Sequence, residues 1–283
     1  MTSPARIDFD NPADLQALRE LAESAARAGG QVARDYFRRQ FTVRRKPDGS
    51  DVTDADESAQ AAVLDVLRRQ RPDDAVIAEE DLPADAPAPA NDTLCWIIDP
   101  LDGTRNFVCG VPIYACAIAA MIGGVPVVGA VYDPEHDEMC STARGAGLFV
   151  DGQPFTRTPT PSSGGATRRP LVGIPSSLSG PAATLVRSWA STVVVRNLGA
   201  TALHLAMVAT GRLQAALVSD SKLWDIAGGW LMVMNAGGVM TTVEDRDVFP
   251  RDIADYRGES IPALAAADQA THARLLSRRG RMR

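Results

Sequence analysis

The sequence predicts an α/β protein whose two halves are built differently. Between residues 94 and 143, tight turns separate short apolar runs, which is typical of strands joined into a largely antiparallel sheet. Two segments with helical periodicity precede this region. After residue 169, short apolar runs alternate with helical segments, which indicates a mixed α/β layer. We therefore expect two helices and an antiparallel sheet, followed by a mixed α/β part.

Caps and apolar spacing justify the two N-terminal helices. Asn11-Pro12 supplies a cap and a proline at the first helical position, and apolar residues recur at helical spacing as far as Tyr36. The segment Thr53-Asp54-Ala55-Asp56 has the form of a capping box, and helical periodicity follows it. We expect a long amphipathic helix and a second helix that begins near Thr53.

Short apolar runs define the remaining elements. The expected strands are 75–78, 94–98, 114–122, 125–132 and 139–143 in the first half, and 171–174, 193–196, 215–218, 239–242 and 263–266 in the second. The expected helices are 182–190, 201–211 and one from about 226 to Gly237-Gly238.

Two stretches lack periodicity. Residues 82–92 are rich in Pro and Ala and predict a surface loop between two strands. Residues 156–169 predict a boundary, which divides the chain into an N-terminal part, 1–156, and a C-terminal part, 157–283.

Composition narrows the classes of function. The chain has 283 residues, 45% of them apolar, and a net charge of -6. An acidic protein has no general electrostatic reason to bind nucleic acid, so no nucleic-acid partner is expected. No apolar run approaches the roughly 20 residues that span a bilayer, so no membrane partner is expected. The four cysteines lack metal-ligand spacing and no signal peptide precedes them, so we expect reduced, mostly buried thiols in a cytoplasmic protein.

Residues 96–107 carry the clearest chemical signal. An apolar run ends in Asp99 and Asp102, and Gly103-Thr104 follows at the expected start of a helix. The two carboxylates are ligands that suit a hard metal ion, and the backbone N–H groups of the Gly-Thr pair can face a phosphate. This order of residues predicts metal-assisted phosphate chemistry.

Other carboxylates stand at element ends, namely Asp56 in a helix first turn, Glu79-Glu80 after a strand, and Asp225 beside a helix. Brought together with Asp99 and Asp102, they repel one another unless cations separate them. Oxygen ligands without a Cys or His set favour Mg²⁺ or Mn²⁺ over zinc. Two such ions about 4 Å apart would polarise a phosphate and acidify a water, which indicates a hydrolase without a covalent nucleophile.

Each of these acids also has a structural explanation that stays open at this point. Asp56 can be a capping-box member, Glu79-Glu80 can be solvated charges at a strand end, and Asp225 can be a helix N-cap. A haloacid-dehalogenase-type site fails on spacing, because Pro100 follows Asp99 and the acids of the motif are three positions apart rather than two.

Four blocks of the chain resemble the inositol monophosphatase family of Mg²⁺-dependent, lithium-sensitive phosphomonoesterases. In order, they are Lys46 with Val52-Thr53-Asp54-Ala55-Asp56, Ala78-Glu79-Glu80, Trp96 to Phe107, and Trp224 to Gly229 with Ala236-Gly237-Gly238. The resemblance implies a layered α/β fold, an αβαβα sandwich. Its N-terminal part would place paired helices on an antiparallel sheet, its C-terminal part would be mixed α/β, and the acids would converge between them.

The resemblance also implies a site with two or three Mg²⁺ ions, for which Mn²⁺ could substitute. The metal ligands would be Glu79, Asp99, the Leu101 carbonyl, Asp102 and Asp225, with Asp99 bridging two ions. Thr104, oriented by Asp56, would help to activate the attacking water, with support from Glu79. The groups around the phosphate and the alcohol would be Gly103, Thr104, Lys46, Glu80, Gly199, Ala200 and Asp225, with Glu80 behind Glu79.

The alcohol moiety of the substrate is left open. Inositol-specific members carry a Glu seven positions before the aspartate that corresponds to Asp225, and here Val218 stands at that position, followed by Ser219 and Asp220. Residues 110–114 resemble histidinol-phosphatase-like members, whereas residues 143–147 are closer to general inositol phosphatases. We expect a small phosphate monoester, with inositol monophosphate first and histidinol phosphate or another sugar or polyol phosphate as alternatives.

Three further features keep alternatives. The Gly199-Ala200-Thr201 corner corresponds to a pocket segment in the family, but Thr201 can also be a helix N-cap. His204 lies in an apolar helical stretch and is expected to be a hydrogen-bonded interior residue.

Because dimers are common among relatives, a homodimer is expected. Some relatives bind partners in transcription, so an interaction or regulatory protein with vestigial catalysis is the rival class, although the presence of all five acids and Thr104 favours catalysis.

Overall fold

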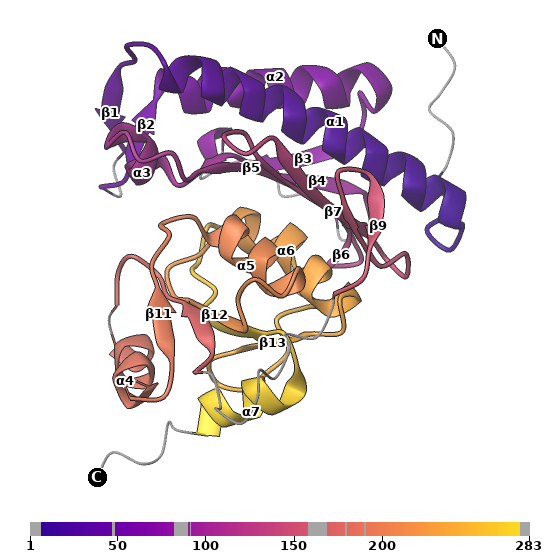
Figure 1. The fold of residues 1–283 in the computed structure, drawn as a ribbon. Helices are drawn as coiled ribbons and strands as arrows, with labels where there is room; N and C mark the ends of the chain where they lie inside the picture. Colours follow the sequence, from indigo (N-terminus) through magenta and orange to yellow (C-terminus); the bar gives the residue numbers. More distant parts are fainter. Residues whose placement is uncertain are drawn as a thin grey trace.

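The described chain is stacked in five layers (Figure 1). The computed structural model describes residues 7–46, 49–81, 90, 92–157, 169–178, 180–189 and 191–277. In order, the layers are helices α1 (Pro12–Phe37) and α2 (Asp54–Gln70), a seven-stranded sheet, helices α5 (Thr201–Ala209) and α6 (Leu223–Asn235), a five-stranded sheet, and helices α4 (Gly180–Trp189) and α7 (Gln269–Leu276). The expected αβαβα sandwich is therefore confirmed.

The seven-stranded sheet follows chain order, and all of its pairings are antiparallel except that of its first two strands. Its strands are β3 (Ala75–Ala78), β4 (Cys95–Asp102), β5 (Ala115–Ile122), β6 (Val125–Asp133), β7 (Glu138–Ala143), β8 (Leu148–Val150) and β9 (Gln153–Phe155). The largely antiparallel sheet is confirmed. The loop expected at 82–92 lies mostly outside the described residues, which omit 82–89 and 91.

The five-stranded sheet mixes parallel and antiparallel pairings, as the alternating pattern predicts. Its order is β11 (Val194–Arg196), β10 (Leu171–Gly173), β12 (Ala215–Val218), β14 (Ala263–Ala266) and β13 (Val239–Thr242). Helix α7 was not expected, although Asp268 caps it by accepting the backbone N–H of Thr271. The hairpin of β1 (Val43–Arg45) and β2 (Asp51–Thr53) leads directly into α2.

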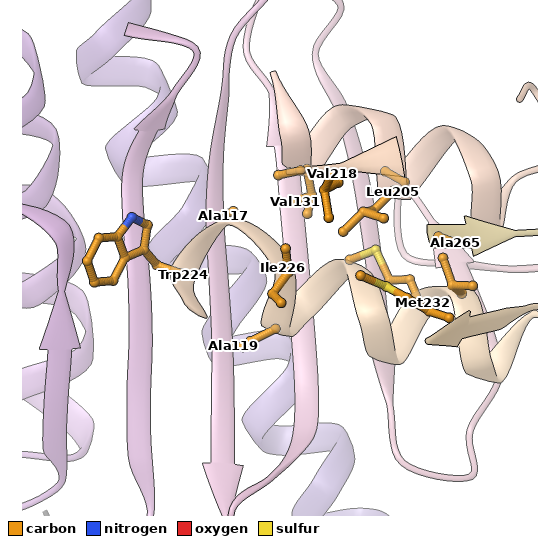
Figure 2. Packing of buried hydrophobic residues seen from close by; sticks show 14 of the residues in the cluster. Ala117, Ala119, Val131, Leu205, Val218, Trp224, Ile226, Met232 and Ala265 are labelled. Carbon is orange, nitrogen blue, oxygen red and sulfur yellow. The ribbon is translucent and has the colours of Figure 1, made fainter. Parts of the chain in front are cut away.

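Helix α6 joins the two sheets. Gly228 packs on Gly129 of β6 so closely that a Cβ on Gly129 would lie 2.7 Å from the Gly228 backbone. Figure 2 shows Ile226 on the side of Ala117 and Ala119 of β5, and Met232 on the side of Ala265 of β14. Because one apolar core contains residues of both sheets, the first turn of α6 is held close to the end of β4.

The boundary between 156 and 157 stays a prediction. The chain passes from the seven-stranded sheet to the five-stranded sheet between β9 and β10, and residues 158–168 of this connection lie outside the described residues. Within the described part, no helix is long and apolar enough to cross a bilayer. All four cysteines are free, and only Cys109 is exposed, as expected for mostly buried thiols.

Candidate active site

The end of β4 presents two aspartates because the strand is interrupted there. Pro100 has no backbone N–H to donate to a neighbouring strand, and the register with β5 shifts between Asp99 and Asp102. The Asp99 carboxylate accepts the N–H of Leu101 at 3.0 Å, which closes a local turn. Both aspartates are buried. The strand therefore ends in a fixed pair of buried carboxyl groups.

Gly103 allows the motif to meet the second half of the chain. Its φ is +99°, and a Cβ there would lie 3.1 Å from the Ile113 carbonyl oxygen and 3.4 Å from Ala200 Cβ. Asn106, at the end of the same motif, donates its side-chain N–H₂ to the carbonyls of Ile113 and Leu198 at 2.8 and 2.7 Å. The predicted site residues Gly103, Gly199 and Ala200 thus lie together. Sequence reasoning missed Asn106, although it lies inside the quoted motif.

Asp102 caps helix α5. Its two carboxylate oxygens accept the backbone N–H groups of Thr201 and Ala202 at 3.0 and 2.7 Å. The N-cap position is Ala200, so the alternative of Thr201 as N-cap is wrong, and a carboxylate from about a hundred residues away supplies the cap instead. Burial raises the pKa of Asp102 to about 7, even though these backbone bonds favour its charged form.

Asp56 has both of the roles that the sequence left as alternatives. One of its oxygens accepts the backbone N–H and the hydroxyl of Thr53, which completes the capping box of α2. The other lies 3.0 Å from the Thr104 hydroxyl, which is also 3.1 Å from the Leu101 carbonyl. Burial raises the pKa of Asp56. The structure therefore brings Thr104 and its expected orienting carboxylate together.

Asp225 meets Asp99 from the opposite layer. Helix α6 begins at Leu223, three residues before the expected start, so Asp225 lies in the first turn and is not the N-cap. Its carboxylate accepts the Lys222 backbone N–H at 2.7 Å, and a hydrogen bond joins the carboxyl groups of Asp225 and Asp99. Burial, followed by the charges of Glu79 and Asp102, raises the pKa of both aspartates well above the usual range. Two hydrogen-bonded carboxyls whose pKa values are raised in this way form a site that favours a cation.

Lys46 bridges the glutamate pair that follows β3. Its ammonium lies 3.0 Å from a Glu79 oxygen and 2.8 Å from a Glu80 oxygen. Burial and the charge of Glu79 raise the pKa of Glu80 to about 7. Although burial opposes it, the two carboxylates raise the pKa of Lys46 above its usual value. Lys46 is thus a cation that already neutralises one side of the acidic cluster.

The donor set fits a hard divalent cation. Glu79, Asp99, Asp102, Asp225 and the Leu101 carbonyl offer only oxygen atoms. Three of the four acids, Asp99, Asp102 and the half-buried Asp225, have raised pKa values. In the described residues, no three His, Cys, Asp or Glu side chains already surround one point as metal ligands. Binding would therefore require that the hydrogen bond between Asp99 and Asp225 opens with loss of its proton, and that Lys46 withdraws from Glu79.

A cavity of about 160 Å³ adjoins this cluster and reaches Asp225. We call it the alcohol pocket. Hydroxyl groups and one exposed carboxylate dominate its lining, which consists of Pro175, Ser176, Ser177, Gly199, Ala200, Thr201, His204, Ser219, Asp220, Ser221 and Asp225. His204 is 2% exposed, accepts the Leu198 N–H, and has a pKa lowered to about 4 by burial, so it is the interior histidine that was expected. Val218 is buried in the core and does not line the pocket.

All the side chains predicted for the site lie within one region, but their chemical roles remain predictions. Asp99, Asp102 and Asp225 influence one another electrostatically, and Glu79 acts on all three. A layered α/β sandwich with oxygen-only ligands beside a Thr-Asp pair defines the class of phosphoester hydrolases that use hard metal ions.

The chain belongs to the inositol monophosphatase family, whose model matches residues 14–281. An inositol-1-monophosphatase from Synechocystis sp. is 31% identical over 272 residues, covering 91% of this chain and 88% of the relative. A protein named Nus factor SuhB from Salmonella typhimurium is 31% identical over 239 residues, covering 80% and 85%. The crystal structure of the suppressor protein SuhB from Bartonella henselae superposes with a TM-score of 0.77 at 27% identity, covering 94% of this chain and 99% of that one. The protein is therefore a phosphoric monoester hydrolase of a generally metal-dependent family.

Proposed function

We propose that the protein hydrolyses a small polyol phosphate monoester with Mg²⁺, and that inositol monophosphate is the first candidate substrate. The observation that carries the proposal is the meeting of the Asp99 and Asp225 carboxyl groups, which a hydrogen bond joins and which are set among Glu79 and Asp102. Such a cluster is stable only with protons or cations, and at neutral pH a divalent cation is the effective neutraliser. Bound there, Mg²⁺ would polarise the phosphate and acidify water.

The protein's own residues would orient and deprotonate the attacking water. Thr104 is held between Asp56 and the Leu101 carbonyl, so its hydroxyl can accept a proton from water while it passes its own proton to Asp56. Glu79 lies across the site and would support this transfer once Lys46 has left it. The Gly103 and Thr104 backbone N–H groups would contact the phosphate oxygens, with Lys46 nearby as a mobile countercharge.

The alcohol pocket supports a polyol. The exposed Asp220 carboxylate can accept hydrogen bonds from vicinal hydroxyls, and so can the Ser219 hydroxyl oxygen, whose own proton goes to the Ser177 carbonyl. An apolar alcohol would offer these acceptors no hydrogen bonds. Val218 stands where inositol-specific members of the family carry a substrate-binding Glu, and it is buried in the core. Recognition of the alcohol would therefore pass to Ser219 and Asp220. Histidinol phosphate and other sugar or polyol phosphates remain the alternatives.

A phosphate-release panel tests the proposal. Inositol, histidinol, sugar and nucleotide monophosphates would be compared at equal concentration with Mg²⁺, with Mn²⁺ and with excess EDTA. We expect metal-dependent turnover and a preference for inositol monophosphate. Equal rates with EDTA would contradict the metal-dependent mechanism. A large preference for another monophosphate would make that compound the proposed substrate in place of inositol monophosphate.

An interaction role is the second candidate, because a relative at 31% identity is named a Nus factor. If the protein is folded and binds metal but hydrolyses none of the substrates in the panel, the interaction role would be favoured over catalysis. We also propose a homodimer in the cytoplasm. Sedimentation equilibrium would check the dimer, and fractionation of the native cell would check the location.

A further inference from the structure

The N-cap residue of α6 cannot cap the helix with its own side chain. Lys222 occupies the N-cap position, and an ammonium cannot accept an N–H bond. Helix N-termini expose N–H groups that need partners, above all when they are buried. Leu223, the first helical residue, is fully buried. Its N–H donates to the Tyr256 hydroxyl at 2.8 Å.

Tyr256 passes this bond on to its own loop. Its hydroxyl donates to the Glu259 carbonyl at 3.1 Å, so the phenol oxygen both accepts and donates. The ring is 4% exposed and packs edge-on against Trp224, with centroids 6.1 Å apart. Burial raises the pKa of Tyr256, which keeps the hydroxyl protonated and able to donate at all working pH values.

Residues 256–261, which we call the clamp, hold the same helix end at further points. The Lys222 ammonium donates to the Gly258 carbonyl and lies 3.4 Å from the Ser260 hydroxyl. The Ile261 N–H donates to the Ser221 carbonyl at 2.8 Å, just before β14 begins. Between Ser221 and Leu223, whose backbones the clamp holds, the Lys222 N–H binds the Asp225 carboxylate directly. The clamp therefore fixes the backbone on which this carboxylate is oriented.

We propose that Tyr256 is a positioning residue which, through the N-terminus of α6, holds the Asp225 carboxylate at the distance from Asp99 that a divalent cation requires. This inference rests on the proposed metal-dependent function. Groups that orient a metal ligand without touching the metal commonly change affinity by about 10- to 100-fold when removed. Tyr256→Phe keeps the ring packing and removes only the hydroxyl relay.

The test is Mn²⁺ affinity, measured by calorimetry and by the electron paramagnetic resonance signal of free Mn²⁺ at 25 °C. We expect Tyr256→Phe to weaken Mn²⁺ binding about tenfold. Tyr132→Phe is the matched control, because that ring is also buried and its hydroxyl binds Asp137. A merely structural role would lower the melting temperature of both variants and leave both Mn²⁺ affinities at the wild-type value.

A second, milder variant keeps the inference testable if Tyr256→Phe does not fold. The exposed Arg257 donates to the carbonyls of Ala254 and Tyr256, so Arg257→Gln loosens the clamp without entering the core. We expect Arg257→Gln to weaken Mn²⁺ binding about threefold, which is less than the effect of removing the Tyr256 hydroxyl itself. Wild-type Mn²⁺ affinity in both variants would overturn the role of Tyr256 and leave the proposed function unaffected. Absence of Mn²⁺ binding by the wild-type protein would overturn the proposed function as well.

Discussion

A hydrogen bond joins the carboxyl groups of Asp99 and Asp225, but the chain holds the two residues by different means. Asp99 lies at the end of a central strand, and its surroundings, the turn at Leu101 and the shifted register with β5, come from adjacent residues and the sheet. Asp225 lies in a helix first turn that depends on Lys222 and on Tyr256, more than thirty residues further along the chain. We call residues 99–104 the strand wall and residues 219–225 the helix wall. The comparison teaches that Thr104, the proposed water-activating group, lies on the locally determined wall, while Ser219 and Asp220, which we propose select the substrate, lie on the wall assembled from distant segments.

The strand wall should be the less tolerant of the two. Asp99→Asn removes the carboxylate that both proposed metal positions share and leaves an amide of the same size. Several kcal/mol of metal stabilisation would be lost, so we expect kcat/KM to fall by about a thousandfold or more. Phosphate release measures the fall, and circular dichroism confirms the fold. A variant that kept the wild-type rate would remove Asp99 from the chemistry.

Thr104 tests the proton transfer on the same wall. Thr104→Ala removes the hydroxyl that lies 3.0 Å from Asp56, and general base catalysis of this kind contributes about 100-fold or more, so kcat should fall about a hundredfold. KM should change little, because substrate contacts remain. Thr104→Ser is the matched control and should retain most of the activity. Equal losses in both variants would point to a packing role for the methyl group.

The pH dependence of stability tests whether protons and cations compete at the strand wall. Burial raises the pKa of Asp102 to about 7, so the folded protein binds more protons than the unfolded chain from about pH 4 to about pH 7. Without metal, this contribution to the free energy of unfolding is present at pH 4 and lost as the pH rises through 7. Mg²⁺ replaces the protons and should raise the melting temperature more at about pH 8 than at about pH 5.

Differential scanning fluorimetry with and without EDTA measures these shifts. At 100 times its Kd, a bound ion contributes about 2.7 kcal/mol to the free energy of unfolding. Asp99→Asn should lose most of the Mg²⁺ response at both pH values. A response that is equal at both pH values would show that protons and cations do not compete at this site.

The difference between the walls also explains what the sequence could predict. The residues of the strand wall stand in one contiguous motif, and Asp56 and Glu79 lie next to recognisable helix and strand ends, so their types and spacing were sufficient to make them candidates. The antiparallel and the mixed sheet were predicted because apolar periodicity is a local property. The stacking of the layers and the joining of the acids into one site came from the family resemblance.

Contacts across the two parts left no local signal. Asp102 caps a helix about a hundred residues away, and the sequence around Ala200 and Thr201 carries no sign of this cap. Tyr256 stands in an irregular segment without periodicity, and its partner Leu223 lies in another element. The start of α6 was placed too late because the stabilising bond to Asp225 comes from within the helix. The cap of α5 and the contact of Tyr256 depend on long-range packing, which single-sequence patterns do not encode. The bond of Asp225 to Lys222 is local by contrast, so the start of α6 is an error of boundary only.

Of the expected effects on the kinetics of hydrolysis, the smallest is that of Asp220, on the helix wall. Asp220→Asn keeps the size of an exposed side chain of the alcohol pocket and removes its charge, so a hydrogen bond from a substrate hydroxyl would weaken. A charged hydrogen bond contributes about 1.5 kcal/mol or more, so KM for inositol monophosphate should rise about tenfold. Hydrolysis of p-nitrophenyl phosphate, which has no hydroxyl groups on its ring, should be unchanged.

Asp245→Asn, which makes the same change outside the pocket, controls for net charge. If both substrates respond equally to Asp220→Asn, the carboxylate acts on the phosphate or the metal and not on the alcohol. Selection among polyols would then have to come from the buried side of the pocket. There the His204 ring accepts the Leu198 N–H and the Ser219 hydroxyl donates to the Ser177 carbonyl, so both have fewer hydrogen bonds left for a substrate. A preference confined to inositol monophosphate would instead show that an exposed carboxylate on the helix wall can replace the glutamate that Val218 displaces.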